Sequence, residues 1–513
     1  MNRISVLEGI MPGRHLLFEA VSYAYDAMSS SLLDSFSATF TSGWTGIVGA
    51  NGAGKTTILK LAAGLLKPLR GKVRLPGDAL YCAQRTDEAP EMLERFIRSA
   101  DREACELKGR LAVGADWAQR WDSLSHGERK RAQIAVMLWL QPSVMALDEP
   151  TNHIDADARD LLITALRRFA GIGLLVSHDR ELLDSLCHQC LFLDPPQAAM
   201  RPGSYTQGRF QARREEDTAR RKRDLASRDL QRLRVEAHRR AEKARAADRR
   251  RSKSALDRND RDGRARIDLA RVTGKDGQDG RLAGRMRSRL ELARHAEQSI
   301  QVRKTYELGI WMSDAYSRRD SLFRLGAGTL PLGGGRELRY PDLMMAPRDR
   351  IGITGGNGSG KSSLVRIILA RIELPPEHLT YLPQEIDAKA SRTILEEARR
   401  LPPDILGRLM TAVSRLGSRP ARLLESMEPS PGEVRKLLLG FGIARQPHLI
   451  IMDEPTNHLD LPSIECLEDA LAGCPCGLLL VSHDLQLLGR LTRTRWHITQ
   501  ADSGCPGSMV LNI

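Results

Sequence analysis

Leu147-Asp148-Glu149-Pro150-Thr151-Asn152-His153-Ile154-Asp155 is repeated 305 positions later, with few changes, as Met452-Asp453-Glu454-Pro455-Thr456-Asn457-His458-Leu459-Asp460. Each copy follows a short apolar run, residues 144–147 and 449–452, of the length typical of a buried parallel strand. Each run leads into two adjacent carboxylates. Burying such charges costs free energy unless they are used, and ligands bind at the carboxyl edge of an open α/β sheet. The repeat therefore predicts two ligand sites, one in each half of the chain.

The paired acids predict metal-assisted hydrolysis. We expect Asp148 and Asp453 to face a magnesium ion, and Glu149 and Glu454 to polarise an attacking water as bases. A single Asp-Glu-Pro could simply end a strand beside a turn, but that structural alternative does not account for a duplicate of nine residues.

The composition describes an ordinary globular protein. Its 513 residues are enough for two or three domains, and 41% hydrophobic with 28% charged residues is a typical balance. No apolar run approaches the roughly 18 residues of a membrane-spanning helix, and residues 1–20 lack a signal-peptide pattern, so we expect a cytoplasmic protein. The eight cysteines include two close pairs, Cys187 with Cys190 and Cys474 with Cys476. They form no four-ligand zinc set, so we expect buried or incidental thiols.

The net charge of +14 belongs to one segment. Residues 201–305 hold 32 Lys and Arg against 16 Asp and Glu, whereas the rest of the chain is almost neutral. A strongly basic segment in an otherwise balanced chain indicates an acidic partner such as nucleic acid.

Each half also contains a phosphate-binding loop. Residues 49–57 fit the pattern G-x-x-x-x-G-K-[ST], between a strand-like run at 44–48 and a helix-like run at 58–66. The glycines let backbone N–H groups surround phosphate at a helix N-terminus, where the lysine reaches the β and γ oxygens and the next hydroxyl binds magnesium. Residues 355–363 repeat the pattern. The predicted phosphate-binding residues are Gly49, Asn51, Gly52, Gly54, Lys55, Thr56, Thr57, Gly355, Asn357, Gly358, Gly360, Lys361, Ser362 and Ser363.

Three shorter motifs recur in the same order in both halves. Gln84 and Gln384 follow strand-like runs, a Ser-x-Gly-Glu precedes a helical pattern, and a Ser-His-Asp follows a later apolar strand. Ser-x-Gly before a helix offers an anion a hydroxyl and free backbone donors, although most such pairs are simple helix caps. Offsets of 300 to 306 between matching residues indicate two homologous halves. The residues singled out are Ser125, Gly127, Glu128 and His178, then Ser430, Gly432, Glu433 and His483.

In this order, the motifs resemble those of the F subfamily of ATP-binding-cassette proteins, soluble tandem-cassette proteins that act as ribosome-associated translation factors or antibiotic-resistance proteins. The resemblance covers nearly the whole chain. It implies an α/β fold with two P-loop NTPase ATP-binding-cassette domains that bind ATP and Mg²⁺ and hydrolyse ATP. It also implies metal-side roles for Thr56, Gln84, Asp148, Ser362, Gln384 and Asp453, and catalytic roles for Glu149, His178, Glu454 and His483.

Family members pair their two cassettes head to tail within one chain, which implies a monomer with two composite sites. Each phosphate loop would then face the opposite Ser-x-Gly-Glu signature: Lys361 would face Ser125, Gly127 and Glu128, and Lys55 would face Ser430, Gly432 and Glu433.

The chain departs from the family pattern in several places. Tyr25 stands where the family has an adenine-stacking aromatic, but residues 326–332 of the second half contain no aromatic. In the signatures, His126 and Pro431 replace the first glycine, and Pro429 replaces the usual leucine. Only 41 positions separate Gln84 from Ser125, too few for the arm insertion of some family members.

The basic segment predicts two long antiparallel helices. Residues 207–251 lack proline and, after Gly208, glycine, and a glycine-containing turn precedes a second helical stretch at about 281–304. The division expected is a first cassette at 1–200, a mainly helical linker at 201–305 and a second cassette at 306–513. Arginines suit a phosphate backbone, and the lack of aromatics favours shape-based contact with folded RNA. The alternative is a solvated helical spacer.

The resemblance implies a partner, because this linker corresponds to the element that reaches toward the P-site tRNA and the peptidyl-transferase centre of the ribosome. We therefore expect ATP to close the cassettes and dock the linker on rRNA and tRNA, and hydrolysis to release it. A transporter ATPase subunit is an alternative, as is a DNA-repair ATPase. The sequence leaves open drug resistance, rescue of stalled elongation and ribosome assembly.

Overall fold

A computed structural model describes residues 15–25, 31–152, 154, 156–251, 277–300, 317–416, 430–457, 459–500 and 508–513. Pro429 and three residues of the repeated stretch, His153, Asp155 and His458, lie outside these ranges. The chain forms two compact units, residues 1–208 with 307–513, and residues 209–306. Both repeats fall in the first unit and most of the basic segment in the second. The limits expected near residues 200 and 305 remain a sequence-based division.

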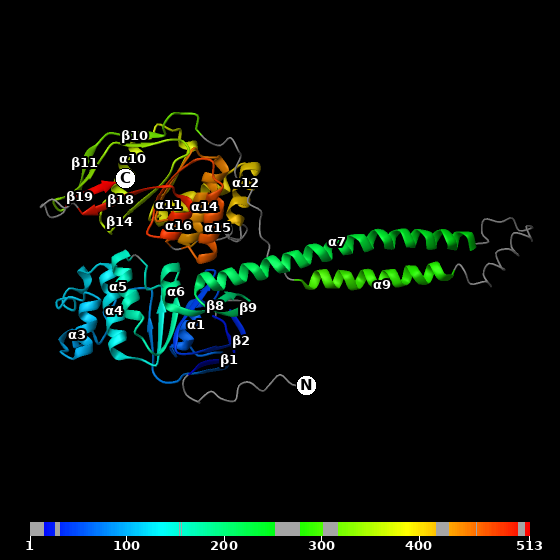
Figure 1. The fold of residues 1–513 in the computed structure, drawn as a ribbon, viewed down its shortest axis with the longest axis horizontal. Helices are drawn as coiled ribbons and strands as arrows, with labels where there is room; N and C mark the ends of the chain where they lie inside the picture. The colour runs from blue at the N-terminus through cyan, green and yellow to red at the C-terminus, as the bar shows by residue number, and fades with distance from the viewer. Residues whose placement is uncertain are drawn as a thin grey trace, which may run out of the picture. The chain divides into compact units, whose positions relative to one another are not determined.

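The first repeat has two sheets (Figure 1). An antiparallel sheet has the order β2–β1–β4, and a six-stranded sheet has the order β5–β6–β7–β3–β8–β9, parallel except for β9. The strands are β1 (Leu16–Tyr23), β2 (Leu33–Phe40), β3 (Gly43–Gly49), β4 (Arg70–Arg74), β5 (Ala79–Cys82), β6 (Val144–Asp148), β7 (Ile172–Val176), β8 (Cys187–Asp194) and β9 (Gln197–Pro202). The helices are α1 (Lys55–Ala62), α2 (Leu93–Arg98), α3 (Arg102–Arg110), α4 (His126–Leu140), α5 (Ala156–Leu166) and α6 (Arg180–Leu186).

The predicted central strands are confirmed by their burial. Every residue of β6 and β7 is buried, as the apolar runs before the Asp-Glu pair and before the Ser-His-Asp motif require. The helix after the phosphate loop begins at Lys55 rather than at the predicted residue 58, and it ends at Ala62 rather than at residue 66. Gly54 caps its start in the left-handed region (φ 97°), and Gly64 (φ 71°) follows its end, so glycine geometry sets both limits.

The second repeat merges its strands into a larger sheet. Its order is β11–β12–β19–β18–β14–β17–β16–β15, and β10 pairs separately with β13. The strands are β10 (Phe323–Leu325), β11 (Gly328–Gly333), β12 (Arg336–Tyr340), β13 (Leu343–Met345), β14 (Arg350–Gly355), β15 (Leu379–Leu382), β16 (Leu449–Asp453), β17 (Gly477–Val481), β18 (Thr494–Gln500) and β19 (Ser508–Asn512). The helices are α10 (Lys361–Arg371), α11 (Ala388–Arg399), α12 (Pro403–Arg415), α14 (Pro431–Arg445), α15 (Leu461–Ala472) and α16 (Leu485–Leu491).

The second unit is a helical hairpin. Helix α7 (Tyr205–Arg251) has 47 residues and is about 70 Å long, and α9 (Gly277–Ser299) runs back beside it (Figure 1). Arg223 of α7 pairs with Glu297 of α9 at 3.6 Å. The second helix begins four residues before the predicted 281, so Gly277 and Gly280 belong to its first turn.

Two further observations concern the whole described chain. Cys474 and Cys476 are joined by a disulfide, against the expectation of free thiols, because the loop between α15 and β17 brings them together. Within the ranges given above, no helix combines the length and apolar character needed to cross a membrane.

Candidate nucleotide-binding sites

The two phosphate loops have the same local geometry. Each connects a central parallel strand to a helix capped by a left-handed glycine, Gly54 (φ 97°) before α1 and Gly360 (φ 100°) before α10. Lys55 Nζ donates to the carbonyls of Gly49 and Ala50 at 2.9 and 3.0 Å. Lys361 Nζ donates to the matching carbonyls at 2.7 and 2.9 Å. Burial lowers the pKa of Lys55, opposed by Glu149, Asp460 and Asp148. Both ammonium groups lie within the loops that would surround phosphate.

Asp148 and Asp453 each lie next to the hydroxyl that follows the lysine. Thr56 Oγ1 donates to Asp148 Oδ2 at 2.8 Å, and the Ser362 hydroxyl bonds Asp453. A carboxylate beside a hydroxyl is a set of hard oxygen donors that suits Mg²⁺. Asp453 Oδ1 is buried without a hydrogen-bond partner among the described residues, which leaves a lone pair available for such an ion. The residues present therefore fit magnesium.

Glu149 and Glu454 face the histidines of the Ser-His-Asp motifs. Glu149 Oε2 accepts from His178 N at 3.1 Å, and Glu149 Oε1 lies 3.1 Å from His178 Nε2. The matching distances for Glu454 and His483 are 3.4 and 3.5 Å. Burial, with repulsion from the adjacent aspartate, raises the pKa of each glutamate to about 8. A raised pKa makes each carboxylate a stronger base, which suits a group that accepts a proton from water.

The two repeats differ in the side chains near their phosphate loops. Tyr25 Oη lies 3.2 Å from Thr57 Oγ1, and its ring packs edge-on against Tyr23. In the second repeat, Leu332 and Arg336 line the cavity near Gly360, and a Cβ on Gly360 would lie 2.7 Å from Leu332 Cδ2. An aliphatic and a cationic side chain thus lie near the second phosphate loop, whereas Tyr25 contacts the first.

A cavity of about 500 Å³ surrounds the second phosphate loop and is lined by both repeats. The second repeat contributes Asn357, Gly358, Gly360, Lys361, Ser362, Ser363, Gln384, Asp453, Glu454 and His483, and the first contributes Thr151, Asn152, Ile154, Arg159, His178 and Arg180. The signature residues Ser125, Gly127 and Glu128 are not in this lining. A Cβ on Gly127 would lie 3.7 Å from Ile154, so Gly127 lies next to one residue of this lining.

Both signatures begin a helix through a capping box. The Ser125 side chain accepts from Glu128 N, and the Glu128 carboxylate accepts from Ser125 N at 2.8 Å. Ser430 and Glu433 repeat this arrangement at α14, where Pro431 is tolerated because the first helical residue needs no N–H donor. Gly432 lies buried in the first turn of α14. The unusual residues at the first-glycine positions are therefore compatible with regular helix starts.

Sequence reasoning did not assign a role to Asp460, although it ends the repeated stretch. Its Oδ2 accepts from Asn51 N of the first phosphate loop at 2.6 Å, so the second repeat reaches the first site.

It also missed two pairs of residues that support the sites. Tyr81 Oη donates to Asp148 at 3.1 Å, and burial together with Asp148 raises the pKa of Tyr81. Asp453 likewise contributes, after burial, to raising the pKa of Tyr381. Tyr81 and Tyr381 stand three residues before Gln84 and Gln384. This repeated spacing in the sequence could have identified them.

The second missed pair is a buried cation on each signature helix. Lys130 Nζ donates to the carbonyls of Ala83 and Gln84 at 2.6 and 3.3 Å. Arg435 donates to the carbonyl of Glu454 at 2.9 Å and to that of Gln384. These cations fix the backbone of the glutamine loops, whose side chains are exposed. Lys130 and Arg435 are 305 positions apart, the same offset as the repeated motifs, and this spacing could have indicated that they have matching roles.

Comparisons with known proteins agree with this geometry. The family model described as ABC transporter matches residues 33–152 and 338–457, one match in each repeat. The ribosome protection protein VmlR of Bacillus subtilis (strain 168) is 27% identical over 467 residues, which cover 88% of this chain and 80% of that protein. The tylosin resistance ATP-binding protein TlrC of Streptomyces fradiae is 29% identical over 520 residues, covering 87% and 90%.

A third relative and a solved structure extend the comparison. The energy-dependent translational throttle protein EttA of Mycobacterium tuberculosis (strain ATCC 25618 / H37Rv) is 26% identical over 517 residues, which cover 87% of this chain and 84% of that protein. The solved structure named RNase-L Inhibitor aligns with a TM-score of 0.60 at 17% identity, covering 96% of this chain and 90% of that one. At this identity the structural likeness shows the fold alone.

The fold, the two phosphate loops with their acidic pairs, and these matches define a tandem ATP-binding-cassette ATPase that binds and hydrolyses ATP. Within that class, the chain is similar over 87 to 88% of its length to a ribosome protection protein, a tylosin resistance protein and a translational throttle protein.

Proposed function

We propose that this chain is a ribosome-binding ATPase of the cytoplasm, a monomer in which ATP closes the two cassettes and closure docks the helical hairpin near tRNA and the peptidyl-transferase region. The observation that carries the proposal is the insertion of an arginine-rich helical hairpin, α7 with α9, between two cassettes that both retain a complete acidic pair. The names of three relatives, a ribosome protection protein, a translational throttle protein and a tylosin resistance protein, support it.

The hydrolytic step assigns a task to each side chain. Lys55 and Lys361 would hold the β and γ oxygens, together with the N–H groups of the phosphate loops. Asp148 with Thr56 and Gln84, and Asp453 with Ser362 and Gln384, would hold Mg²⁺, which supplies positive charge to the phosphate oxygens. Glu149 and Glu454 would accept the proton of the attacking water, held in place by His178 and His483.

The composite sites are also part of the proposal. Ser125, Gly127 and Glu128 would complete the site at Lys361, and Ser430, Gly432 and Glu433 the site at Lys55. Support comes from the hydrogen bond between Asn51 N and Asp460, which joins the repeats at the first site, and from the first-repeat residues that line the cavity at Lys361. Closure would move each signature toward the opposite phosphate loop.

The experiment that tests the proposal is sedimentation with ribosomes. The double variant Glu149→Gln with Glu454→Gln keeps the size of both side chains but removes both bases, so it should bind ATP and stay closed. We expect this variant to pellet with ribosomes in the presence of ATP and to remain in the supernatant without it. Pelleting that ignores ATP would contradict the proposal. Recovery with membranes instead would indicate the alternative, an ATPase subunit of a transporter.

A further inference from the structure

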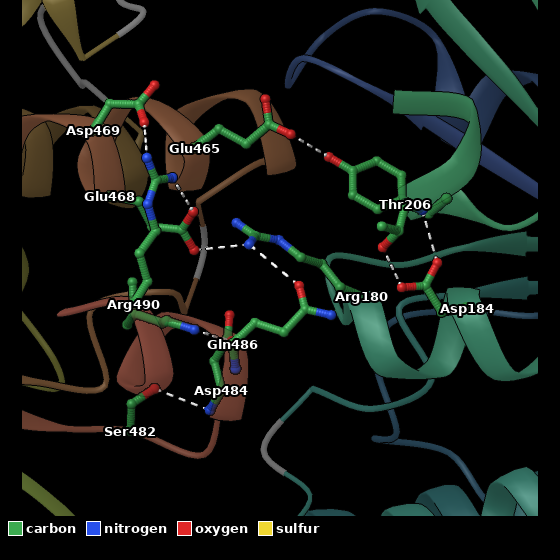
Figure 2. A network of polar contacts seen from close by, with 12 residues as sticks. Arg180, Asp184, Thr206, Glu465, Glu468, Asp469, Ser482, Asp484, Gln486 and Arg490 are labelled. Atoms are coloured by element: carbon green, nitrogen blue, oxygen red, sulfur yellow. Dashed lines mark hydrogen bonds and ion pairs between the residues drawn. The ribbon is translucent and has the colours of Figure 1, made fainter. Parts of the chain in front are cut away.

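A buried ion pair joins the two cassettes at one place and is absent from the matching place. Arg180, two residues after His178, is buried, and its Nη1 lies 2.7 Å from Glu468 Oε1. Figure 2 shows Arg180 reaching from α6 of the first cassette toward the side chains of α15 and α16 in the second. With the 305-residue offset, the matching positions are Leu485 and Ile163. The repeats therefore make a charged contact through Arg180 and Glu468, but the matching residues Leu485 and Ile163 cannot make one.

Glu468 is shared between two arginines. Its Oε2 lies 3.0 Å from Arg490 Nη1, and Arg490 also pairs with Asp469, so this second contact stays within the second cassette (Figure 2). The Glu468 side chain is only 3% exposed. A charge buried to this extent is stable only with a partner. If either arginine is removed, the other still neutralises Glu468, and only the contact of Arg180 crosses between the cassettes.

Helix α6 also holds the beginning of the linker helix α7. Asp184 of α6 accepts hydrogen bonds from Thr206 N, at 2.8 Å, and from Thr206 Oγ1. Tyr205, the first residue of α7, is buried, and its Oη donates to Glu465 Oε1 at 2.9 Å. Glu465 and Glu468 are three residues apart on α15, hence on one face of that helix. The first residues of α7 are thus held by both cassettes (Figure 2).

The other end of α6 lies at the first acidic pair. Asp179 caps α6, with its side chain accepting from Leu182 N at 3.1 Å, and His178 directly before it contacts Glu149. His178 is joined to α6 through the capping residue Asp179, so a displacement of His178 would be passed to Arg180 and Asp184 in that helix. The chain of contacts therefore runs from Glu149 through α6 to α15 and to α7.

We propose that Arg180 and Glu468 are positioning residues that transmit the state of the Glu149 site to the second cassette and to the first turns of α7. This inference rests on the proposed function, because it takes ATP-driven closure as the event that moves the linker. Leu485, at the matching place, is 48% exposed and carries no charge, whereas the Arg180–Glu468 ion pair is buried and has a defined geometry. The first turns of the linker helix α7 therefore respond to the state of the site at Glu149 and His178 rather than to that of the site at Glu454 and His483.

Two variants separate this linkage from a general effect on stability. Arg180→Leu introduces the residue found at the matching position and removes the contact between the cassettes. Arg490→Leu is the matched control, since it also takes one arginine from Glu468 but leaves that contact in place. Both are made in the Glu149→Gln, Glu454→Gln protein. The measurement is hydrogen exchange of the backbone amides in the first turns of α7, with and without ATP and without ribosomes.

Coupling between sites typically changes affinity 5- to 150-fold. In the parent protein, which carries only Glu149→Gln and Glu454→Gln, we expect ATP to slow hydrogen exchange in these turns by about tenfold. The same slowing is expected in Arg490→Leu, whereas in Arg180→Leu it should be less than about twofold. Arg180→Lys, which keeps the charge, should restore most of the response. An unchanged response in Arg180→Leu, or an equal loss in both leucine variants, would overturn the linkage. A parent that responds to ATP but never pellets with ribosomes would refute the proposed function and leave the linkage standing.

Discussion

Glu149 and Glu454 have backbone conformations that few side chains adopt. Their φ angles are 49° and 48°, in the left-handed region that costs a residue other than glycine about 1 kcal/mol or more. The neighbouring strands impose this geometry, because Glu149 N donates to Val176 O and Glu454 N to Val481 O, both at 2.8 Å. The turn directs each carboxyl toward its histidine. Strain at both acidic pairs therefore supports their use in chemistry.

The first prediction concerns these two bases. The double variant Glu149→Gln with Glu454→Gln should lose at least about 100-fold in ATP turnover, because the water loses its proton acceptor. ATP binding should persist, since the phosphate loops are untouched. Phosphate release and equilibrium binding of ATP measure the two quantities. Each single variant should keep turnover at the remaining site. Wild-type turnover by the double variant would show that the bases are assigned wrongly.

The second prediction concerns Tyr25 and the unequal adenine ends. Stacking of a base on an aromatic ring contributes about 1 to 3 kcal/mol, so Tyr25→Ala should weaken ATP binding at the Lys55 site by that amount. The site is isolated by Lys361→Ala, and the converse background, Lys55→Ala, reports on the other site. Tyr25→Phe is the control, because it keeps the ring and loses only the contact with Thr57. If Tyr25→Ala weakened ATP binding equally in the Lys361→Ala and Lys55→Ala backgrounds, the assignment of Tyr25 to the Lys55 site would be wrong.

The residues predicted from the sequence are those whose neighbours along the chain define their role. Lys55 within its glycine loop and the acidic pair after β6 belong to this kind. Tyr81 could not be placed, because its contact with Asp148 depends on the pairing of β5 with β6, which sets Tyr81 opposite Ala146. Tyr81 and Ala146 are 65 positions apart, and neither strand's own sequence determines how the two strands are aligned. Asp460 was missed for the same reason, since its partner Asn51 lies 409 residues away.

At the scale of helices and strands, pattern and glycine placement determined most of what could be predicted. Helix α7 was predicted to within two residues because it is long and free of proline. The larger sheet of the second repeat could not be predicted, because β12 joins it through β19, which lies about 170 residues later. A hairpin that forms its own sheet in one repeat thus extends the main sheet in the other.

The third prediction concerns the buried cation of helix α14. Arg435 is 2% exposed and donates to the carbonyls of Glu454 and Gln384, so it ties the signature helix to the acidic pair and to the glutamine loop. Arg435→Met should destabilise the protein by about 1 to 3 kcal/mol for each carbonyl left without a donor. Arg435→Lys should cost less, because Lys130 makes two carbonyl contacts at the matching position. Urea unfolding measures both, and equal losses would contradict this role.

At the scale of the whole molecule, the two homologous cassettes differ in the contacts that they make with the linker and with each other. The first has Tyr25 in contact with its phosphate loop, the arginine that crosses to Glu468, and the direct covalent connection from β9 into α7. Its site is therefore the better placed of the two to control the linker. The second cassette has the cavity lined by both repeats, which suits a site that opens and closes with the first.

The last prediction joins the linker charges to ribosome binding. Arg221, Lys222 and Arg228 are exposed on α7, and reversing all three to glutamate should weaken contact with a phosphate backbone. Arg223 is left unchanged because it pairs with Glu297 inside the hairpin. The matched control reverses Lys67, Arg70 and Lys72, three exposed cations of the first cassette, and so changes the net charge equally.

In the closed double-glutamine protein, we expect the linker reversal to cut co-sedimentation with ribosomes steeply and to reduce the slope of log affinity against log salt by up to about 3, because roughly one counterion is released for each phosphate neutralised. The cassette reversal should leave that slope nearly unchanged. With the wild-type glutamates, both reversed proteins should hydrolyse ATP in the absence of ribosomes at nearly the unmodified rate, since neither set touches the nucleotide sites. A linker reversal that keeps full binding and the same salt slope would make the hairpin a solvated spacer, and the ribosome contact would then have to lie on the cassettes.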